Sequence, residues 1–279
     1  MAEPDASDDD KPRTAIARAI DALASLFDWL VSFPLAAFAE VGVMARLTFE
    51  TVLWGIRPPY RPARLIDAMN FIGVESIFIV GLTGLLVGGV FSLQIVDSLR
   101  QFSAESRSGQ IVGLALAREL GPVFSALMIS SRAGSSIATE IGSMRVSSQI
   151  DALTTMSVSP VQYLIAPRVL AGILVCPAMA LLFDCIGLFG AYAVAVHVYG
   201  LDGGVFLELA RWLVDGIDIA QGLVKAAIFG AAVTLIACRQ GFYATGGAAG
   251  VGQATNRAVV QSAVAVLVLD YFVTTFFVG

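Results

Sequence analysis

Lysine is scarce in this chain of 279 residues. The lysines are Lys11 and Lys225, and neither is followed by serine or threonine, which excludes a nucleotide-binding loop of the form GxxxxGKS or GxxxxGKT. The stretch GGAAGVG at 246–252 follows an apolar run and lacks the strand–loop–helix setting of a phosphate-binding loop. The chain is therefore not expected to hydrolyse ATP. Because no nucleophile–base pair is evident either, we do not expect an enzyme.

Cysteine and histidine are also rare. The three cysteines, Cys176, Cys185 and Cys238, lie inside apolar runs and lack the spacing of metal ligands. Thiols in such positions usually pack as small apolar side chains. His197, the single histidine, cannot form a metal site alone. We expect neither a metal nor a cofactor.

Charged residues make up 14% of the chain, whereas 57% of its residues are hydrophobic. This composition lies outside the range of soluble domains and indicates a membrane protein. The net charge of -5 arises in the first ten residues, which contain Glu3, Asp5, Asp8, Asp9 and Asp10. Residues 1–12 are expected to form a disordered acidic tail, because they are polar and contain proline. They also lack the basic start and apolar core of a secretory signal.

Long apolar runs dominate the rest of the chain. A helix needs about 20 predominantly apolar residues to cross a bilayer. Five runs qualify, at roughly 71–99, 111–134, 163–196, 218–238 and 258–278. The third is long enough to tilt or bend, and Pro177 could kink it. Residues 13–56 are apolar but carry charges at intervals, which favours amphipathic helices in the membrane interface over a sixth span.

Basic residues are distributed unevenly between the two sides of these spans. If residues 57–70 are cytoplasmic, that side contains Arg57, Arg61, Arg64, Arg145, Arg168, Arg239 and Arg257. The other side contains Arg100, Arg107 and Arg211. Cytoplasmic flanks are enriched in arginine and lysine. We therefore expect a cytoplasmic amino terminus and a periplasmic carboxy terminus, with Glu75 as a solvated residue near the cytoplasmic start of the first span.

The segment EIGSMRVSSQIDALTTMSVSP at 140–160 connects the second and third spans. Ser148 and Asp151 have the spacing of a capping box, which predicts that a short helix begins there and ends before Pro160. Its apolar positions follow helical spacing. The narrow stripe consists of Val146, Ile150, Leu153 and Ser157, with Met156 beside them. The pattern alone allows two interpretations, a docking element for a cytoplasmic partner or a helix resting on lipid headgroups.

Ionisable side chains within the apolar runs are functional candidates, because burying them in a bilayer is costly. They are Arg118, Glu119, Lys225, Asp184 and Asp270. Arg118 and Glu119 lie about eight residues into the second span, roughly 12 Å along a helix, and Lys225 reaches a similar depth in the fourth. Asp184 or Asp270 could offset either cation. The group could bind a phosphate headgroup, or it could be an ion-pair network that only fixes helix packing.

Several motifs occur in a fixed order, beginning with RELGPVFSALMISSRAGSSIATEIGSMRVSSQIDALTTMSVSP at 118–160. PRVLAG follows at 167–172, GLVKAAIFG at 222–230 and GFYATGGAAGVGQATNRAVVQSAVAVLVLDYF at 241–272. Together they resemble the MlaE-type permeases, the membrane subunits of MCE-associated ABC phospholipid transporters. The resemblance covers residues 65–279.

The resemblance implies a role for each candidate residue. It suggests that Arg118, Glu119 and Lys225 line a lipid cavity, and that the segment at 140–160 is a coupling helix inserted into a cytoplasmic ATPase. The implied coupling residues are Glu140, Arg145, Ser148, Ile150, Asp151, Leu153 and Met156. Its implied partners are phospholipid, the ATPase subunit, a periplasmic MCE-domain protein and a second copy of the chain, but no nucleic acid.

We therefore expect an all-α, polytopic inner-membrane protein with amphipathic amino-terminal helices, five transmembrane helices and a permease domain at 57–279. The expected function is a permease subunit that moves glycerophospholipid to or from an MCE-protein ring in support of outer-membrane lipid asymmetry. The alternative is a stand-alone secondary carrier or channel that uses the intramembrane charges to relay ions. A purely structural membrane scaffold is a third possibility.

Overall fold

The computed structural model describes residues 42–51, 53 and 62–278. The acidic tail at 1–12 and most of the expected interfacial helices at 13–56 lie outside these residues. The chain divides into two compact units, Met1–Phe49 and Glu50–Gly279. Where the first unit is described, it is helical from 42 to 49. The second unit contains all the expected spans.

Every regular element described in the second unit is helical, as expected for an all-α protein. Within residues 42–51, 53 and 62–278, five helical segments are long and apolar enough to cross a membrane. They are Pro62–Arg100, Glu105–Val146, Val161–His197, Gly216–Phe242 and Gly247–Phe277. The predicted five-span, polytopic architecture is confirmed. The observed helices extend beyond the predicted runs because helical hydrogen bonding continues into the polar flanks.

The first span consists of α2 (Pro62–Ile72), the short turn η1 (Val74–Ser76) and α3 (Ile77–Arg100). The third consists of the π-helical turn η5 (Val161–Ile165) and α8 (Ala166–His197), which continues through Pro177. The fourth and fifth are α10 (Gly216–Phe242) and α11 (Gly247–Val278).

The second span changes helical pitch twice. Two π-helical turns, η3 (Leu116–Leu120) and η4 (Ser130–Gly134), separate α4 (Ser108–Ala115), α5 (Gly121–Ile129) and α6 (Ser135–Val146). A π turn inside an α-helix often marks a functional site, because it re-aims side chains that regular helix would direct elsewhere. Arg118 and Glu119 lie in η3.

Helices α3 and α8 approach each other through glycine. A Cβ atom at Gly84 would lie 2.9 Å from the carbonyl oxygen of Phe183, and one at Gly88 would overlap the carbonyl of Gly187. The GxxxG spacing in the first span therefore serves packing within the chain, as small residues often do between membrane helices.

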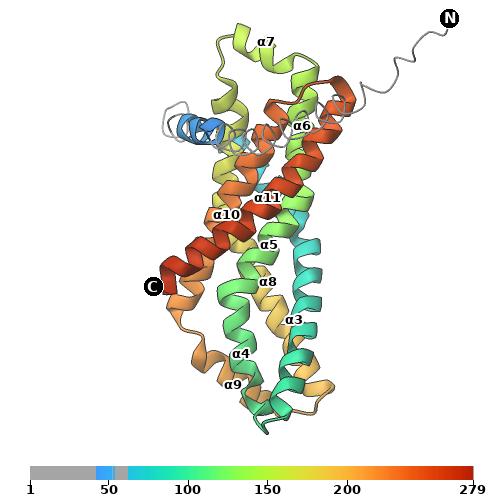
Figure 1. Cartoon of the computed structure of the whole chain (residues 1–279), viewed down its shortest axis with the longest axis vertical. Helices are drawn as coiled ribbons and strands as arrows, with labels where there is room; N and C mark the ends of the chain where they lie inside the picture. Colours follow the sequence, from blue (N-terminus) through green and yellow to red (C-terminus); the bar gives the residue numbers. More distant parts are fainter. Residues whose placement is uncertain (1–41, 52, 54–61, 279) are drawn as a thin grey trace, which may run out of the picture. The chain divides into compact units, whose positions relative to one another are not determined.

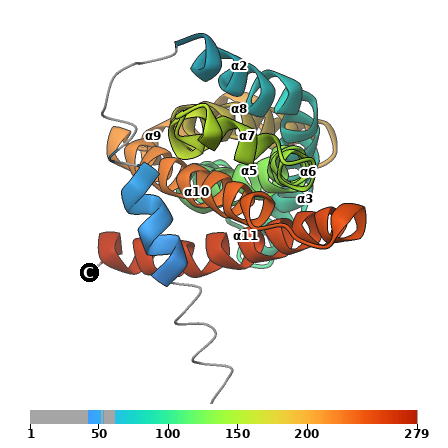
Figure 2. The same ribbon diagram turned by 90° about the horizontal axis from the view of Figure 1, so that it is seen from above.

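Short helices close the two ends of the spans. Figure 1 shows α7 (Gln149–Thr155) at one end and α9 (Gly203–Leu213) at the other. In the view along the bundle, α10 lies between α8 and α11 (Figure 2). Helix α11 is an outer helix, because only 11% of its most apolar stretch of 18 residues is buried.

Candidate functional site

In the π turn η3, the backbone carbonyl of Arg118 accepts from a side chain of another helix. In a regular helix the carbonyl of Arg118 would accept from the backbone N–H of residue 122, but Pro122 has no N–H. The ammonium of Lys225 in α10 donates to this carbonyl instead, at 3.1 Å. The RELGP sequence thus supplies two charged side chains, Arg118 and Glu119, and a backbone carbonyl that accepts from Lys225 of another helix.

Lys225 is the centre of a charge cluster, which we define as Arg118, Glu119, Asp218, Lys225 and Asp270. Its side chain is 3% exposed. The Nζ atom lies 2.6 Å from Oε2 of Glu119, 3.1 Å from Oδ1 of Asp270 and 2.7 Å from the hydroxyl of Thr274. One ammonium therefore joins the second, fourth and fifth spans, and its burial is compensated by two carboxylates and a hydroxyl.

The guanidinium of Arg118 pairs with a different acid. Its Nη2 atom lies 2.5 Å from Oδ1 of Asp218, and its Nε donates to the same oxygen at 2.7 Å. Asp218 is 3% exposed, and its other oxygen accepts from the backbone N–H of Asp215 in a capping box at the start of α10. The Arg118 side chain remains 42% exposed. Arg118 is thus held from one side and open on the other.

Sequence reasoning missed Asp218, although two signals point to it. The spacing Asp215-x-x-Asp218 resembles a capping box with an acid at both ends. Asp218 also precedes Lys225 by seven residues, about two helical turns, which places both on one face of α10.

The two other predicted acids have different surroundings. Asp270 contacts Lys225, as one of the sequence alternatives proposed. Asp184 packs against Gly121, where a Cβ atom would overlap its Oδ1, and within the described part of the chain that oxygen has no hydrogen-bond partner. Asp184 lines a separate, mostly apolar cavity of about 450 Å³ with Leu116 and Leu188. It does not belong to the charge cluster.

The connecting helix α7 begins where the sequence predicts but is not capped as predicted. Ser148 has a left-handed backbone (φ 58°), and its hydroxyl caps no backbone N–H. The carboxylate of Asp151 instead accepts from Arg145 at 2.6 Å. The capping-box interpretation was wrong, because a left-handed residue directs its side chain away from the first helical turn and a nearby guanidinium binds the acid more strongly than an amide does.

The apolar side chains of α7 do not all face outward. Ile150 is buried at 1% exposure, Leu153 is half-buried and Met156 is 72% exposed. Ile150 therefore secures α7 to its own chain, whereas Met156 is available to a partner.

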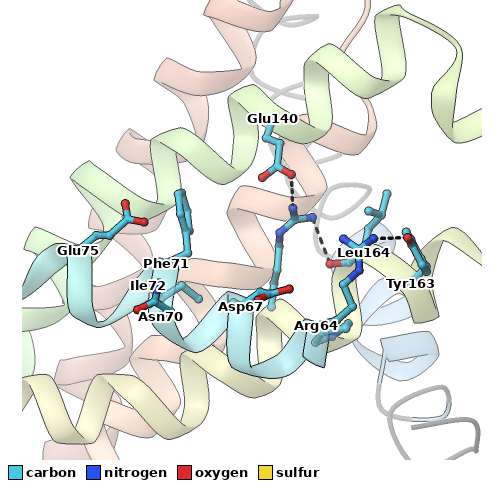
Figure 3. A pocket seen from close by; sticks show the side chains of 12 residues that line it. Arg64, Asp67, Asn70, Phe71, Ile72, Glu75, Glu140, Tyr163 and Leu164 are labelled. Carbon is cyan, nitrogen blue, oxygen red and sulfur yellow. Dashed lines mark hydrogen bonds and ion pairs between the residues drawn. The ribbon is translucent and has the colours of Figure 1, made fainter. Parts of the chain in front are cut away.

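Glu140 lies in α6, before α7, and its Oε1 atom is 2.7 Å from Nη2 of Arg168 in α8. The pair borders a cavity of about 320 Å³ that is lined by both charged and apolar side chains (Figure 3). Glu75 lines the same cavity and is partly exposed, as expected near the end of a span, but it also forms an ion pair with Arg132 that the sequence did not indicate. Across residues 42–51, 53 and 62–278, no group of three or more His, Cys, Asp or Glu side chains is placed to hold a metal ion.

Comparison with known proteins agrees with this architecture. Residues 65–276 match the family model of permease MlaE. The chain belongs to the MlaE permease family. The match covers the five spans, η3, α7 and the charge cluster, nearly the same range as the resemblance in the sequence motifs.

Individual relatives match over most of the chain. A probable ABC transporter permease protein of Rickettsia felis is 41% identical over 241 residues, 86% of this chain and 93% of that protein. The intermembrane phospholipid transport system permease protein MlaE of Haemophilus influenzae is 41% identical over 216 residues, 77% of this chain and 83% of that protein. The chloroplastic protein TRIGALACTOSYLDIACYLGLYCEROL 1 of Arabidopsis thaliana is 34% identical over 205 residues, 74% of this chain and 59% of that protein.

Proposed function

We propose that this chain is the permease subunit of an ABC transporter in the inner membrane that moves glycerophospholipid between that membrane and a periplasmic ring of MCE-domain proteins. Membership of the MlaE family supports the proposal, as does the name of the Haemophilus relative, which specifies intermembrane phospholipid transport. Such transport would contribute to the lipid asymmetry of the outer membrane.

The half-exposed guanidinium of Arg118 is the observation that carries the proposal. Asp218 binds one edge of the guanidinium, and 42% of the side chain stays accessible. A guanidinium with a free edge suits a phosphate oxygen, because its planar donors match phosphate geometry. Lys225 is too enclosed to be the first contact of a headgroup, so its role here is to position Glu119 and the η3 carbonyl.

A second copy of the chain is proposed to complete the cavity. Helix α11 contributes Asp270 and Thr274 to the cluster, while its other face exposes apolar side chains. They are Val264, Leu267, Val268, Tyr271 and Phe272. A homodimer packed across this face would place two charge clusters on either side of a two-fold axis. A cavity there has room for two acyl chains, which one set of five spans would enclose poorly.

The energy for transport is assigned to a separate cytoplasmic ATPase, since the sequence contains no nucleotide-binding loop. We propose that this ATPase docks at α7, where Met156 is exposed and Asp151 pairs with Arg145 of α6. The arginine distribution supports a cytoplasmic location for α7 and the amino terminus and a periplasmic one for the carboxy terminus. ATP-driven movement of α7 would then reshape the cavity.

Lipid loading of the purified complex tests the proposal. Arg118→Glu should abolish co-purifying phospholipid, measured by mass spectrometry, and leave the amount of assembled complex unchanged. Arg107→Glu reverses an exposed arginine outside the charge cluster and is the matched control. Normal phospholipid content in Arg118→Glu would contradict the proposal. Gradient-driven ion or solute transport by the chain alone in liposomes would favour the carrier or channel instead.

A further inference from the structure

Helix α7 is carried by two helices that scarcely touch each other. The chain enters α7 from α6 and leaves it through η5 and α8. Within residues 62–278, α6 and α8 each pack along α10 rather than along one another. The direct contact between these two supports of α7 is therefore limited to a few side chains, and the rest of their connection runs through α10.

The ion pair of Glu140 and Arg168 bridges the supports directly. Its N···O distance is 2.7 Å, and the Arg168 side chain is 14% exposed. Arg168 also donates to the carbonyl of Leu164 in η5, at 3.3 Å. The guanidinium therefore contacts both η5, which follows α7, and Glu140 of α6, which precedes it. Glu140 and Arg168 both line the cavity that Glu75 also lines, and Figure 3 shows Glu140 and Glu75 among its lining residues. Charged and polar side chains such as Arg64, Asp67 and Asn70 also line this cavity and could contact either partner if the pair separates.

Helix α7 is also fastened to α6 by the pair of Arg145 and Asp151. Helix α6 continues through η4 and α5 to η3, so it belongs to the same rod that carries Glu119. Glu140 follows Glu119 by 21 residues along this rod, about 30 Å of helix. A displacement of α7 therefore reaches the charge cluster through α6, provided that α6 and α8 do not move apart first.

We propose that Glu140 and Arg168 are positioning residues that form a clamp, which makes both supports of α7 move as one body when the ATPase acts on it. This proposal rests on the proposed function and reassigns Glu140, which sequence reasoning placed among the contacts to the ATPase. The clamp lies at the base of the connection and acts within the chain. Without the clamp, α7 still moves with the ATPase, but a smaller part of its displacement reaches η3.

Coupling measurements on the reconstituted transporter, with its ATPase, test the clamp. Glu140→Gln and Arg168→Gln should each lower the lipid moved per ATP hydrolysed roughly three- to fivefold, the scale on which a partly exposed ion pair shifts an equilibrium. Binding of the ATPase and co-purifying phospholipid should be unchanged. The exchange Glu140→Arg with Arg168→Glu should restore coupling. Asp67→Asn removes an acid from the same cavity and should have no effect.

Three outcomes of that experiment would overturn the clamp. They are a wild-type coupling ratio in Glu140→Gln, an equal loss in Asp67→Asn, or loss of ATPase binding in Glu140→Gln, which would make Glu140 a docking contact.

A second measurement does not depend on lipid transport. Spin labels attached at Ser147→Cys and Ser159→Cys report the separation of the two supports. The background variant is Cys185→Ala, which removes the exposed thiol and keeps the two buried ones. The distance distribution should be narrow with the clamp intact and broader in Glu140→Gln. An unchanged width would refute the clamp. If the wild-type complex moves no lipid and the distribution still broadens, the proposed function fails and the clamp stands.

Discussion

The Nζ atom of Lys225 lies 2.6 Å from Oε2 of Glu119, although 106 positions separate the two residues in the chain. This contact fixes the fourth span against the second at the π turn η3. Asp270 and Thr274 bring the fifth span to the same ammonium. A cation that joins three spans has a structural effect as well as an electrostatic one, and the two can be separated by substitution.

Lys225→Met should destabilise the protein strongly. It removes the shared cation and leaves the carboxylates of Glu119 and Asp270 without compensation. Breaking a fully buried pair costs about 3–5 kcal/mol. Because the Glu119 side chain is 41% exposed, we expect a smaller loss of about 2–3 kcal/mol. Thr274→Val removes a neutral partner and should cost about 1 kcal/mol. Thermal unfolding of the detergent-solubilised protein measures both. Equal melting temperatures for the two variants would show that Lys225 does not hold the three spans together.

Asp218→Asn should weaken lipid binding without unfolding α10. The amide has nearly the shape of the acid but loses the charge that holds Arg118. A hydrogen bond to a charged group is worth about 1.5–3 kcal/mol, so roughly a tenfold loss of affinity for a fluorescent phospholipid is expected. Asp215→Asn is the matched control, because asparagine caps helices as well as aspartate does. If Asp215→Asn lowers affinity as much, the cap matters and the orientation of Arg118 does not.

The spans and the depth of the charged residues could be predicted from the sequence. Both follow from the number of residues in each apolar run. A bilayer needs about 20 apolar residues, and helical rise converts position into depth. That arithmetic placed Arg118, Glu119 and Lys225 at one level, where the structure brings them together. It could not identify Asp218, which lies in the first turn of α10 and becomes buried only because that turn packs against η3.

The predicted capping box failed for a different physical reason. Sequence spacing reports which residues could meet but not the backbone conformation between them. Ser148 adopts a positive φ, and Arg145 competes successfully for the carboxylate of Asp151. The ion pair of Glu75 could not be foreseen either, since its partner Arg132 lies 57 positions away in another span. Long-range partners of a charged residue depend on tertiary packing.

Gly88→Ala should destabilise the α3–α8 interface. The added methyl group would overlap the carbonyl of Gly187 and force the two helices apart. Overpacking at such a position costs about 1–3 kcal/mol. Gly252→Ala is the control within α11, where a Cβ atom meets nothing within 4 Å. That change should instead stabilise the helix by about 0.5–1 kcal/mol. Thermal unfolding measures the stability of both variants. A Gly88→Ala variant as stable as Gly252→Ala would contradict the close packing of α3 and α8.

Replacing Asp151 and Leu153 together by alanine should separate the permease from its ATPase. Leu153 is the half-buried member of the apolar positions of α7, and Asp151 fixes Arg145 beside the helix. Two contact residues of this kind lower affinity about tenfold or more in protein interfaces. Co-purification of the ATPase with the tagged permease measures the effect, and lipid bound by the permease should persist.

Ser148, which the family resemblance places among the coupling residues, is tested separately by Ser148→Gly. It changes the same segment but suits the left-handed backbone at φ 58°, so it should gain up to about 1 kcal/mol in stability and retain the ATPase. If the double alanine variant retains the ATPase as well, then α7 is not the docking element. If Ser148→Gly loses it, the ATPase depends on the serine hydroxyl and not on the side chains at 151 and 153.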